Sequence, residues 1–452
     1  MPRRPLHNSS RRTFLKSAAL AGAALPFANP AWLKAAGAGE KLNLASVGVG
    51  GKGWSDLLGI TASPHVNVVA LCDVDESKEH LGRAAEKWPH AQRYTDWRKL
   101  LDQAKNFDAL HVATPDHMHA PITLAALALG KHVYCQKPLT HSVLEARVVA
   151  QAAKKAGVVT QMGNQIQSHD AYRTAVKLVH DGAIGKVKEV YSWQSGTPKW
   201  PRGLDRPAGM DPIPKTVDWD LWLGVAPVRP YKAEVYHPFA WRGWQDYSNG
   251  QLGDFGCHIL DPVFMALELT APRTFKADAP PINKESWTKW ATVAYEFPGT
   301  KHTAGSSIKV TWYDGEGVFP PRELLGVPEG TKLPGSGSLL IGEKGTLLIP
   351  HVAAPQLLPA DKFADYKLPQ LDKRDHYVSW ADACRGQDKT TSHFGYSGPL
   401  TETVLLGAIA VRLPGETFEW DAANMKITNS TEANRLLTKP YRQGWAPAGI
   451  SS

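Results

Sequence analysis

Between residues 41 and 162, short continuous apolar runs alternate with segments in which apolar residues recur every three or four positions. Continuous apolar runs are typical of parallel strands covered on both faces, and the wider spacing is typical of helices that bury one side. The predicted strands are 42–47, 66–72, 109–113, 132–135 and 158–161. The predicted helices are 54–63, 76–87, 97–103, 122–129 and 142–156. This alternation predicts an α/β domain built on a doubly wound parallel sheet.

The pattern changes after Gly163, where a helix and a strand are followed by a Pro-, Trp- and Tyr-rich stretch with little periodicity. Later strand-like runs are separated by turn residues, which predicts a second, α+β domain with a large, mainly antiparallel sheet. The predicted elements are 171–180, 186–193, 290–297, 307–313, 338–341, 345–349, 377–385 and 399–412. From this change we expect a first domain over 40–162 and a second over 163–452.

The first 38 residues differ from the rest of the chain. Residues 10–16 read S-R-R-T-F-L-K, an apolar run follows at 18–27, and Ala36-Gly37-Ala38 offers a small-residue cleavage site. This order is typical of a twin-arginine signal, which exports proteins that have already folded. An uncleaved membrane anchor is the alternative, although the run is short and rich in alanine. We expect residues 1–38 to be a signal read by the twin-arginine export machinery, and the mature protein to be periplasmic or secreted.

Charge and cysteine content narrow the function classes further. The chain has 51 Lys and Arg against 43 Asp and Glu, and six of the basic residues fall in the signal segment, which has no acidic residue. The remaining net charge of +2 gives no electrostatic reason to expect nucleic acid as a partner. The four cysteines lack CxxC spacing, and Cys257 is predicted at a helix start. Neither a disulfide framework nor a structural metal site is expected.

A glycine-rich turn follows the first predicted strand. Gly48, Gly50 and Gly53 match G-x-G-x-x-G, a spacing that allows a tight turn, a close approach of the backbone to a pyrophosphate, and packing of helix on strand. Together with Gly51 and Lys52, these residues are expected to bind a dinucleotide at a helix start, as in a Rossmann domain. A plain helix-capping turn is the alternative.

Asp73 ends the second predicted strand, 25 residues after Gly48. A carboxylate at this place accepts both hydroxyls of a ribose and repels a 2′-phosphate, so NAD is the expected cofactor rather than NADP. No pool of free cofactor exists outside the cell. Export after folding therefore implies that the protein carries bound NAD with it.

Two further strand ends carry polar residues to the same edge of the sheet. The first holds Thr114, Pro115 and His119 within T-P-D-H-M-H, and we expect these three to line the cofactor. A metal pair formed by its two histidines is the less favoured alternative. The second strand ends in Gln136-Lys137-Pro138, of which Gln136 and Lys137 are expected to contact the cofactor. The ammonium of Lys137 is placed to hold a substrate hydroxyl beside the nicotinamide. The alternative is a surface lysine in a turn.

A fourth motif, G-D-F-G-C-H-I-L-D, lies at 253–261. Asp254 and His258 are four residues apart and share a face if the segment is helical, while Pro262 is expected to strain or kink that helix. The functional interpretation makes His258 the base for an alcohol proton and Asp254 a substrate-binding carboxylate. A capping aspartate and a structural histidine are the alternative, which spacing alone favours.

In this order, the four motifs resemble the glucose–fructose oxidoreductase and inositol dehydrogenase family (Gfo/Idh/MocA), over residues 41–445. The resemblance implies that Lys137, Asp254 and His258 are the active-site lysine, aspartate and histidine. The usual family motif is Glu-Lys-Pro; here Gln136 replaces the glutamate, which removes a charge beside the cofactor ribose and is expected to leave the lysine less paired. Members with export signals hold nicotinamide tightly, and pairing through the open face of the second sheet is common, which implies a homo-oligomer.

Tryptophans crowd the stretch before the Asp254 motif, and their flat rings suit the apolar faces of sugars. We expect Trp241, Arg242 and Asp254 to bind a carbohydrate, with Asp246 as a further group for hydroxyls, and at least half of the tryptophans to serve packing alone. The crowded tryptophans are Trp193, Trp200, Trp219, Trp222, Trp241 and Trp244.

These observations predict an exported NAD-dependent oxidoreductase that acts on a hydroxyl of a sugar or cyclic polyol. The first alternative is a glycoside hydrolase or lyase that oxidises its sugar transiently and returns the hydride, as some relatives in the family do. The second is a binding protein that keeps NAD as part of its structure.

Overall fold

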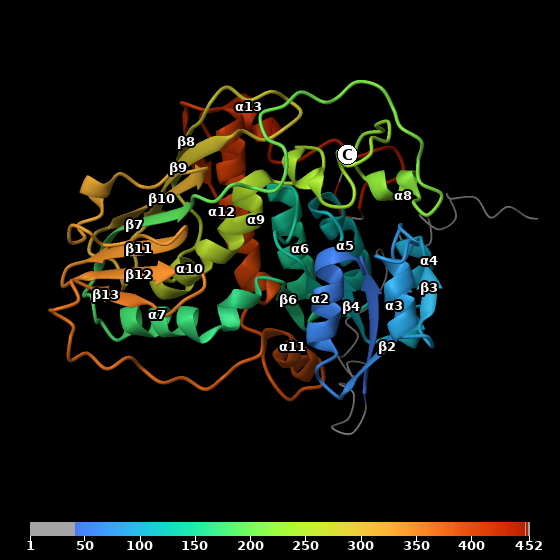
Figure 1. Cartoon of the computed structure of the whole chain (residues 1–452), viewed down its shortest axis with the longest axis horizontal. Coiled ribbons are helices and arrows are strands. Elements are labelled where there is room, and N and C mark those ends of the chain that lie inside the picture. The colour runs from blue at the N-terminus through green and yellow to red at the C-terminus, as the bar shows by residue number, and fades with distance from the viewer. Residues whose placement is uncertain (1–40, 448, 451–452) are drawn as a thin grey trace, which may run out of the picture.

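The computed structural model describes residues 41–447 and 449–450 of the 452-residue chain, so the predicted signal at 1–38 lies outside the described residues. Two sheets and the helices around them form the structure, and Figure 1 shows the parallel sheet on one side and the larger sheet on the other. Among the described residues, no helix combines the length and apolar character needed to pass through a lipid bilayer.

The first sheet is parallel throughout, with the order β3-β2-β1-β4-β5-β6. The chain moves outward from β1 in one direction as far as β3, and then returns to β1's other side with β4. Open sheets of this kind bind ligands at the carboxyl ends of the strands where the order reverses. The strands are β1 (Leu42–Val47), β2 (Val66–Cys72), β3 (Gln92–Tyr94), β4 (Ala109–Val112), β5 (His132–Cys135) and β6 (Thr160–Met162).

The helices of this part begin at places that differ from the prediction. Helix α3 starts at residue 81 instead of 76, because the backbone just after β2 pairs with a distant segment: Asp75 forms a bridge with Val217, and the amide of Glu76 donates to the carbonyl of Thr216 at 2.8 Å. Helix α5 starts earlier than predicted, with a proline in its first turn, where no amide is needed. The helices are α2 (Gly51–Ile60), α3 (Leu81–Lys87), α4 (Trp97–Leu101), α5 (His119–Ala128) and α6 (Val143–Ala156).

The second sheet has nine strands in the order β13-β12-β11-β7-β10-β9-β8-β14-β15. Only the β7–β10 pair is parallel, so the predicted mainly antiparallel sheet is confirmed. The strands are β7 (Val187–Gln194), β8 (Thr274–Asp278), β9 (Trp290–Pro298), β10 (Ser307–Gly315), β11 (Ser336–Gly342), β12 (Thr346–Pro350), β13 (Gln356–Leu358), β14 (Thr417–Asp421) and β15 (Lys426–Ile427).

The motif around His258 forms two short helices instead of one. Helix α9 ends at residue 259 and α10 begins at 261 with Pro262 in its first turn, so the proline starts a helix and does not strain one. Cys257 lies inside α9, and the prediction that it starts a helix was wrong. The remaining helices are α7 (Asp170–His180), α8 (Trp219–Leu223), α9 (Gly250–Ile259), α10 (Asp261–Leu267), α11 (His376–Cys384), α12 (Phe394–Arg412) and α13 (Thr431–Arg435).

Helix α12 joins the two halves, lying between the sheets in Figure 1 and packing against α6 on one side and against β8 and β9 on the other. Fifteen of its 19 residues are buried, as expected for a helix surrounded by protein. It begins at Phe394, five residues before the predicted start at Pro399, because Thr160 Oγ1 of β6 accepts the first amide at 3.0 Å.

A long segment between β7 and α9, here called the arm (residues 195–249), crosses from the second sheet to the first, and Figure 1 shows its early part in green above the parallel sheet. Its pairing with the end of β2 holds it there, since the amide of Asp218 also donates to the carbonyl of Val74 at 2.8 Å. Buried aromatic side chains of the arm pack together in one cluster: Trp219, Trp222, Tyr231, Tyr236, Trp241, Trp244 and Tyr247.

Candidate active site

The main cavity has a volume of about 850 Å³ and lies at the carboxyl edge of the parallel sheet, between the glycine turn, the arm and helix α9. A volume of this size suits an enclosed small-molecule ligand. Most of the predicted site residues line it, whereas Gly53 and His119 do not. The predicted residues that line it are Gly48, Gly50, Gly51, Lys52, Asp73, Thr114, Pro115, Gln136, Lys137, Trp241, Arg242, Asp254 and His258.

Three glycines of the turn, Gly48, Gly50 and Gly53, leave no room for a side chain. Gly48 has φ +81°, and a Cβ atom there would lie 2.6 Å from the carbonyl oxygen of Ala113. At Gly53 a Cβ atom would lie 2.0 Å from the carbonyl oxygen of Gly48, so this glycine allows helix α2 to pack on the turn. Gly50 caps α2 without a side-chain hydrogen bond, so the first amides of the helix are available to a ligand. This cradle fits a pyrophosphate.

Asp73 supports the turn as well as the cavity. One of its carboxylate oxygens accepts the amides of Val49 at 2.8 Å and Gly50 at 3.3 Å, and the other accepts the amide of Asp75 at 3.1 Å. An ionised carboxylate has about four acceptor positions, so capacity for a ribose hydroxyl remains. The predicted ribose contact stays a prediction, and the carboxylate now has a second role in shaping the turn.

A histidine that the sequence analysis missed lies directly over the turn. A Cβ atom on Gly50 would fall 2.0 Å from His80 Nδ1, and the imidazole lies 3.7 Å from Asp73 and 3.8 Å from Asp75. Burial lowers the pKa of His80, but the two carboxylates outweigh it and raise that pKa overall. His237 Nε2 of the arm donates to the same Asp75 carboxylate at 2.8 Å, so this group connects the arm to the cofactor cavity.

Gln136 is part of a buried network below the turn. Its amide donates to Asp56 Oδ2 at 2.6 Å, His111 approaches the same oxygen at 3.3 Å, and Lys52 pairs with the other oxygen. Tyr377 of α11 also donates to Asp56, at 2.9 Å. The charge lost by replacing the glutamate of the usual motif is therefore supplied nearby by Asp56 of α2.

Lys137 is firmly paired, contrary to the expectation from that replacement. Its ammonium donates to Asp254 Oδ1 at 2.6 Å and to the backbone carbonyl of Asp254 at 2.8 Å. Arg242 lies 3.5 Å from the same carboxylate oxygen. Although burial raises it, the two cations lower the pKa of Asp254 overall, so the carboxylate is charged. An ammonium has three donors, so one N–H of Lys137 is left for a ligand oxygen.

His258 of α9 reaches the same cavity and is 8% exposed. Burial, followed by the Lys137 ammonium, holds the pKa of His258 well below its ordinary value, so the ring is neutral at neutral pH. Its Nδ1 is buried without a hydrogen-bond partner among the described residues, which leaves Nε2 as the nitrogen able to meet a ligand. A neutral imidazole can accept a proton, as a general base must.

Asp116 is a second group that the sequence analysis missed. It is 4% exposed, lines the cavity, and accepts the amide of Asn249 at 3.3 Å. Burial raises the pKa of Asp116 to about 7, against the opposing effect of Lys137 and Arg242. The residue stands inside the T-P-D-H-M-H motif, but its protonation depends on burial when the arm packs on the first sheet, which the motif does not reveal.

The rings of the two histidines in that motif contact backbone carbonyls. His117 Nε2 lies 3.1 Å from the carbonyl oxygen of Trp222. Both ring nitrogens of His119 face backbone carbonyls, those of Pro138 at 2.7 Å and Thr114 at 2.8 Å. Burial lowers the pKa of His119 to about 4. His119 therefore braces the two loops that carry the cavity wall instead of lining it.

The aromatic wall of the cavity comes from the arm. Three of the six crowded tryptophans line the cavity, which is compatible with the expectation that at least half serve packing alone: Trp200, Trp222 and Trp241. The guanidinium of Arg242 lies 4.3 Å from the ring centroid of Trp241, so a cation and a flat ring stand side by side near Asp254. Asp246 does not line this cavity and instead pairs with arginines elsewhere in the arm.

Two models of one protein family match the chain. The first, described as "Oxidoreductase family, NAD-binding Rossmann fold", matches residues 42–164, and the second, "Oxidoreductase family, C-terminal alpha/beta domain", matches 173–308. Together they cover more than half of the chain. The chain belongs to this oxidoreductase family, Gfo/Idh/MocA. Its first part is accordingly an NAD-binding Rossmann domain, which agrees with the glycine cradle and with Asp73.

Individual members of the family are more distant. The chain is 25% identical over 229 residues to levoglucosan dehydrogenase of Pseudarthrobacter phenanthrenivorans. This match covers 49% of this chain and 50% of that protein. It is 29% identical over 187 residues to a glycosyl hydrolase family 109 protein of Stenotrophomonas maltophilia, covering 39% and 40%. The chain thus spans about half or less of the length of these curated relatives.

A solved structure shares the fold over nearly its whole length. The WlbA dehydrogenase of Bordetella pertussis, in complex with NADH and UDP-GlcNAcA, superposes with a TM-score of 0.58 at 16% identity, covering 84% of this chain and 99% of that one. At this identity the likeness shows the fold alone.

Proposed function

We propose that this protein oxidises a hydroxyl of a sugar or cyclic polyol, using tightly bound NAD. The observation that carries the proposal is the convergence of Lys137, Asp254 and His258 in one cavity, next to a glycine cradle that fits a pyrophosphate. The match of the chain to dehydrogenases named for levoglucosan and inositol supports a carbohydrate-like substrate.

In the proposed mechanism, the residues around the cavity bind, orient and deprotonate the alcohol. The chemistry that NAD supplies when bound is acceptance of a hydride from the carbon that bears the hydroxyl. Lys137 directs its free N–H toward the alcohol oxygen, and Asp254 fixes the direction of that ammonium through the 2.6 Å contact. His258, neutral and open at Nε2, takes the hydroxyl proton.

The surrounding residues determine which molecule the cavity accepts and take part in proton transfer. The flat faces of Trp200 and Trp241 suit the apolar faces of a sugar ring. Arg242 offers donors for further hydroxyls beside Asp254. With a pKa of about 7, Asp116 takes up or releases a proton near neutral pH. Its ionised form can therefore accept a proton that the alcohol loses.

A second candidate function uses the same residues for glycoside cleavage with no net oxidation. The specific observation in its favour is the 29% identity to a glycosyl hydrolase family 109 protein. In that case the protein would release an alcohol from a glycoside while its bound NAD returned to the starting state. The two candidates share the hydride step and differ in the net reaction.

The experiment begins with a panel of monosaccharides, anhydrosugars, cyclic polyols and aryl glycosides. Purified protein is mixed with each compound, with and without an added carbonyl acceptor. Formation of oxidised product and of reduced nicotinamide is measured and compared with aglycone release. Oxidised product without cleavage supports the dehydrogenase. Aglycone release without net oxidation supports the hydrolase. If neither occurs with any compound although NAD is bound, the protein is a binding protein.

We further propose that the chain is exported by the twin-arginine machinery and assembles as a homo-oligomer. The motif at residues 10–16 supports export, and the family resemblance supports pairing through the second sheet. Cell fractionation of the wild type and of an Arg11→Lys, Arg12→Lys double variant tests the first point, and light scattering of the purified protein tests the second. Equal export of both forms would contradict the signal assignment, and a monomer would contradict the assembly.

A further inference from the structure

A second, smaller cavity is separate from the proposed active site and carries an excess of positive charge. It has a volume of about 170 Å³ and is lined by the last turns of α12, by residues 435–440, and by the turn that precedes α9; we call it the α12 cavity. Its basic lining residues are Lys284, Arg412, Arg435 and Lys439, and its one acidic lining residue is Asp246.

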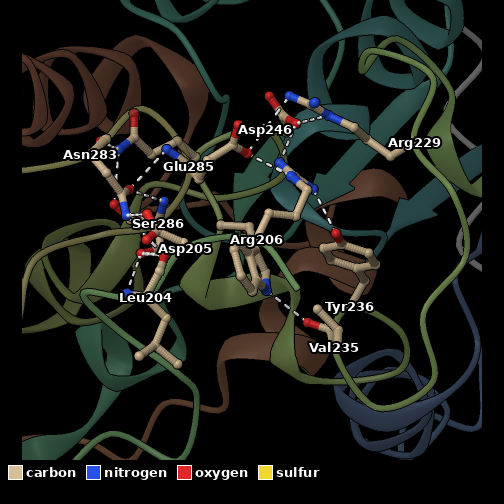
Figure 2. A network of polar contacts seen from close by, with 12 residues as sticks. Leu204, Asp205, Arg206, Arg229, Val235, Tyr236, Asp246, Asn283, Glu285 and Ser286 are labelled. Carbon is tan, nitrogen blue, oxygen red and sulfur yellow. Dashed lines mark hydrogen bonds and ion pairs between the residues drawn. The ribbon is translucent and has the colours of Figure 1, made fainter. Parts of the chain in front are cut away.

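Asp246 does not neutralise these cations, because it is already engaged. Figure 2 shows its carboxylate held by two arginines of the arm, with Asp246 Oδ2 accepting Arg206 Nη2 at 2.8 Å and Arg229 Nε at 3.0 Å. Glu285 accepts Arg206 Nε at 2.6 Å and completes the group. Two arginines and two carboxylates balance one another, so the network is neutral overall, although the Asp246 carboxylate still favours the charged form of Arg412.

Lys439 is also balanced within the protein. Its ammonium pairs with Glu145 at 3.0 Å and donates to the carbonyl of His117 at 3.2 Å. His141 next to it is neutral, because burial and then Lys439 hold the pKa of His141 well below its ordinary value. Neither residue adds to the charge excess or removes it.

Three cations remain: Lys284, Arg412 and Arg435. Within the described parts of the chain, none of their side chains forms a hydrogen bond or an ion pair at 4 Å or less. Lys284 and Arg435 are exposed at the mouth, while Arg412 is partly buried at the end of α12. Burial lowers the pKa of Arg412, and only Asp246 acts against that effect.

The position of Arg412 at the end of a helix does not explain why a partly buried arginine has no ion-pair partner. A cation there is favoured by the helix dipole, an effect of about 0.3–1 kcal/mol. The dipole supplies no acceptors for the five N–H groups of the Arg412 guanidinium, and none comes from the described residues. An oxyanion in the cavity would supply both the acceptors and the charge.

We propose that the α12 cavity binds a small organic anion with at least two negative charges, such as a short dicarboxylate or a phosphate ester. Its volume lies below the range of about 300–1,000 Å³ typical of sites for larger ligands, which restricts the occupant to a short skeleton. Leu405, Ala408 and Ile409 line one wall and suit a few carbon atoms. Lys284, Arg412 and Arg435 line the same cavity, and Gln245 and Asn249 add polar groups to its lining.

The site touches the proposed active site through one residue. The side chain of Asn249 belongs to the lining of the α12 cavity, and its backbone amide donates to Asp116 at 3.3 Å. The inference does not depend on the proposed function, because it rests on charges and contacts outside the main cavity.

The experiment measures thermal unfolding and calorimetric binding of the full chain with succinate, glyceryl phosphate and inorganic phosphate. Sodium chloride at matched ionic strength and glycerol serve as the reference solutes. We expect saturable binding of succinate or glyceryl phosphate, and a matching rise in melting temperature. Binding of glyceryl phosphate alone, or of succinate alone, identifies which oxyanion the site accepts. Stabilisation equal to that in chloride would overturn the proposal.

Variants separate a ligand role of Arg412 from a structural one. Arg412→Gln is expected to weaken binding at least tenfold, while Lys155→Gln, an exposed lysine on α6 outside the cavity, leaves it unchanged. Without anion, Arg412→Gln is expected to melt at or above the wild-type temperature, because it removes an unpaired charge. A purely structural role predicts a lower melting temperature and unchanged binding. If Arg412→Gln does not fold, the exposed pair Lys284→Gln, Arg435→Gln is expected to show the tenfold loss, and unchanged binding there overturns the proposal.

Discussion

Replacing Asp116 by asparagine tests the electrostatics of the proposed active site. In the folded protein, burial holds the pKa of Asp116 at about 7, compared with an ordinary value of 3.8. Between these two values the folded state keeps a proton that the unfolded state releases. The free energy of unfolding therefore falls as pH rises through this window, by at most about 1.4 kcal/mol per pH unit. The full cost of ionising Asp116 in the folded protein is about 4 kcal/mol.

Asp116→Asn removes this pH-dependent cost and keeps an acceptor for the amide of Asn249. From pH 5 to pH 8, the free energy of unfolding of the variant is expected to rise relative to the wild type by about 2.5 kcal/mol. Asp261, whose pKa burial also raises to about 7, contributes equally to both proteins and cancels in the difference. Urea unfolding at several pH values, on protein with matched NAD content, measures this quantity.

The control is Asp365→Asn, a substitution at an exposed aspartate, which is expected to follow the wild type at every pH. A difference between Asp116→Asn and wild type that stays constant from pH 5 to pH 8 would refute the reasoning. It would mean that Asp116 is ionised throughout, stabilised by Lys137 and Arg242 more strongly than burial opposes it.

Four further substitutions address the other groups. His258→Ala and Lys137→Ala are each expected to lower turnover by about 10²–10⁴-fold while bound NAD is retained, and their effects should not add, because both act on one proton transfer; full additivity in steady-state rates would contradict this. Asp73→Ala is expected to weaken NAD binding by about 1–3 kcal/mol, since it removes charge-assisted bonds and loosens the turn; unchanged NAD content after dialysis would place the ribose elsewhere. Gln136→Glu would put two carboxyls in contact at Asp56, so stability at neutral pH should fall by about 1–3 kcal/mol and recover in acid; equal melting curves at both pH values would exclude this contact.

The parallel sheet was predictable because its strands are buried on both faces. The ranges 42–47, 66–72 and 132–135 agree with β1, β2 and β5. The short strands β13, β14 and β15 were not predicted, since two to five residues carry little periodicity. The start of α3 was predicted too early because the backbone just before this helix pairs with the arm. The local sequence does not reveal that contact.

The candidate site also contains residues whose positions were predictable from sequence and others whose positions were not. Strand ends bring Lys137 and the glycine turn to one edge, so their neighbourhood followed from sequence order and the parallel topology. His258 needed the family resemblance, because spacing alone favoured a structural role. The pKa of Asp116 and the meeting of His80 with His237 depend on how the arm packs on the first sheet, and neither could be predicted from local sequence.

The central claim is that Lys137, Asp254 and His258 serve a hydride transfer between a sugar or polyol and NAD bound in the same cavity. Rapid mixing of the purified protein with each compound of the panel, followed by the absorbance of reduced nicotinamide, tests it most directly. The account predicts that at least one compound reduces the bound NAD of the wild type, and that His258→Ala does so at least about a hundredfold more slowly with the same NAD content. Reduction at the same rate in wild type and His258→Ala, or no reduction with any compound by protein that holds NAD, would contradict it.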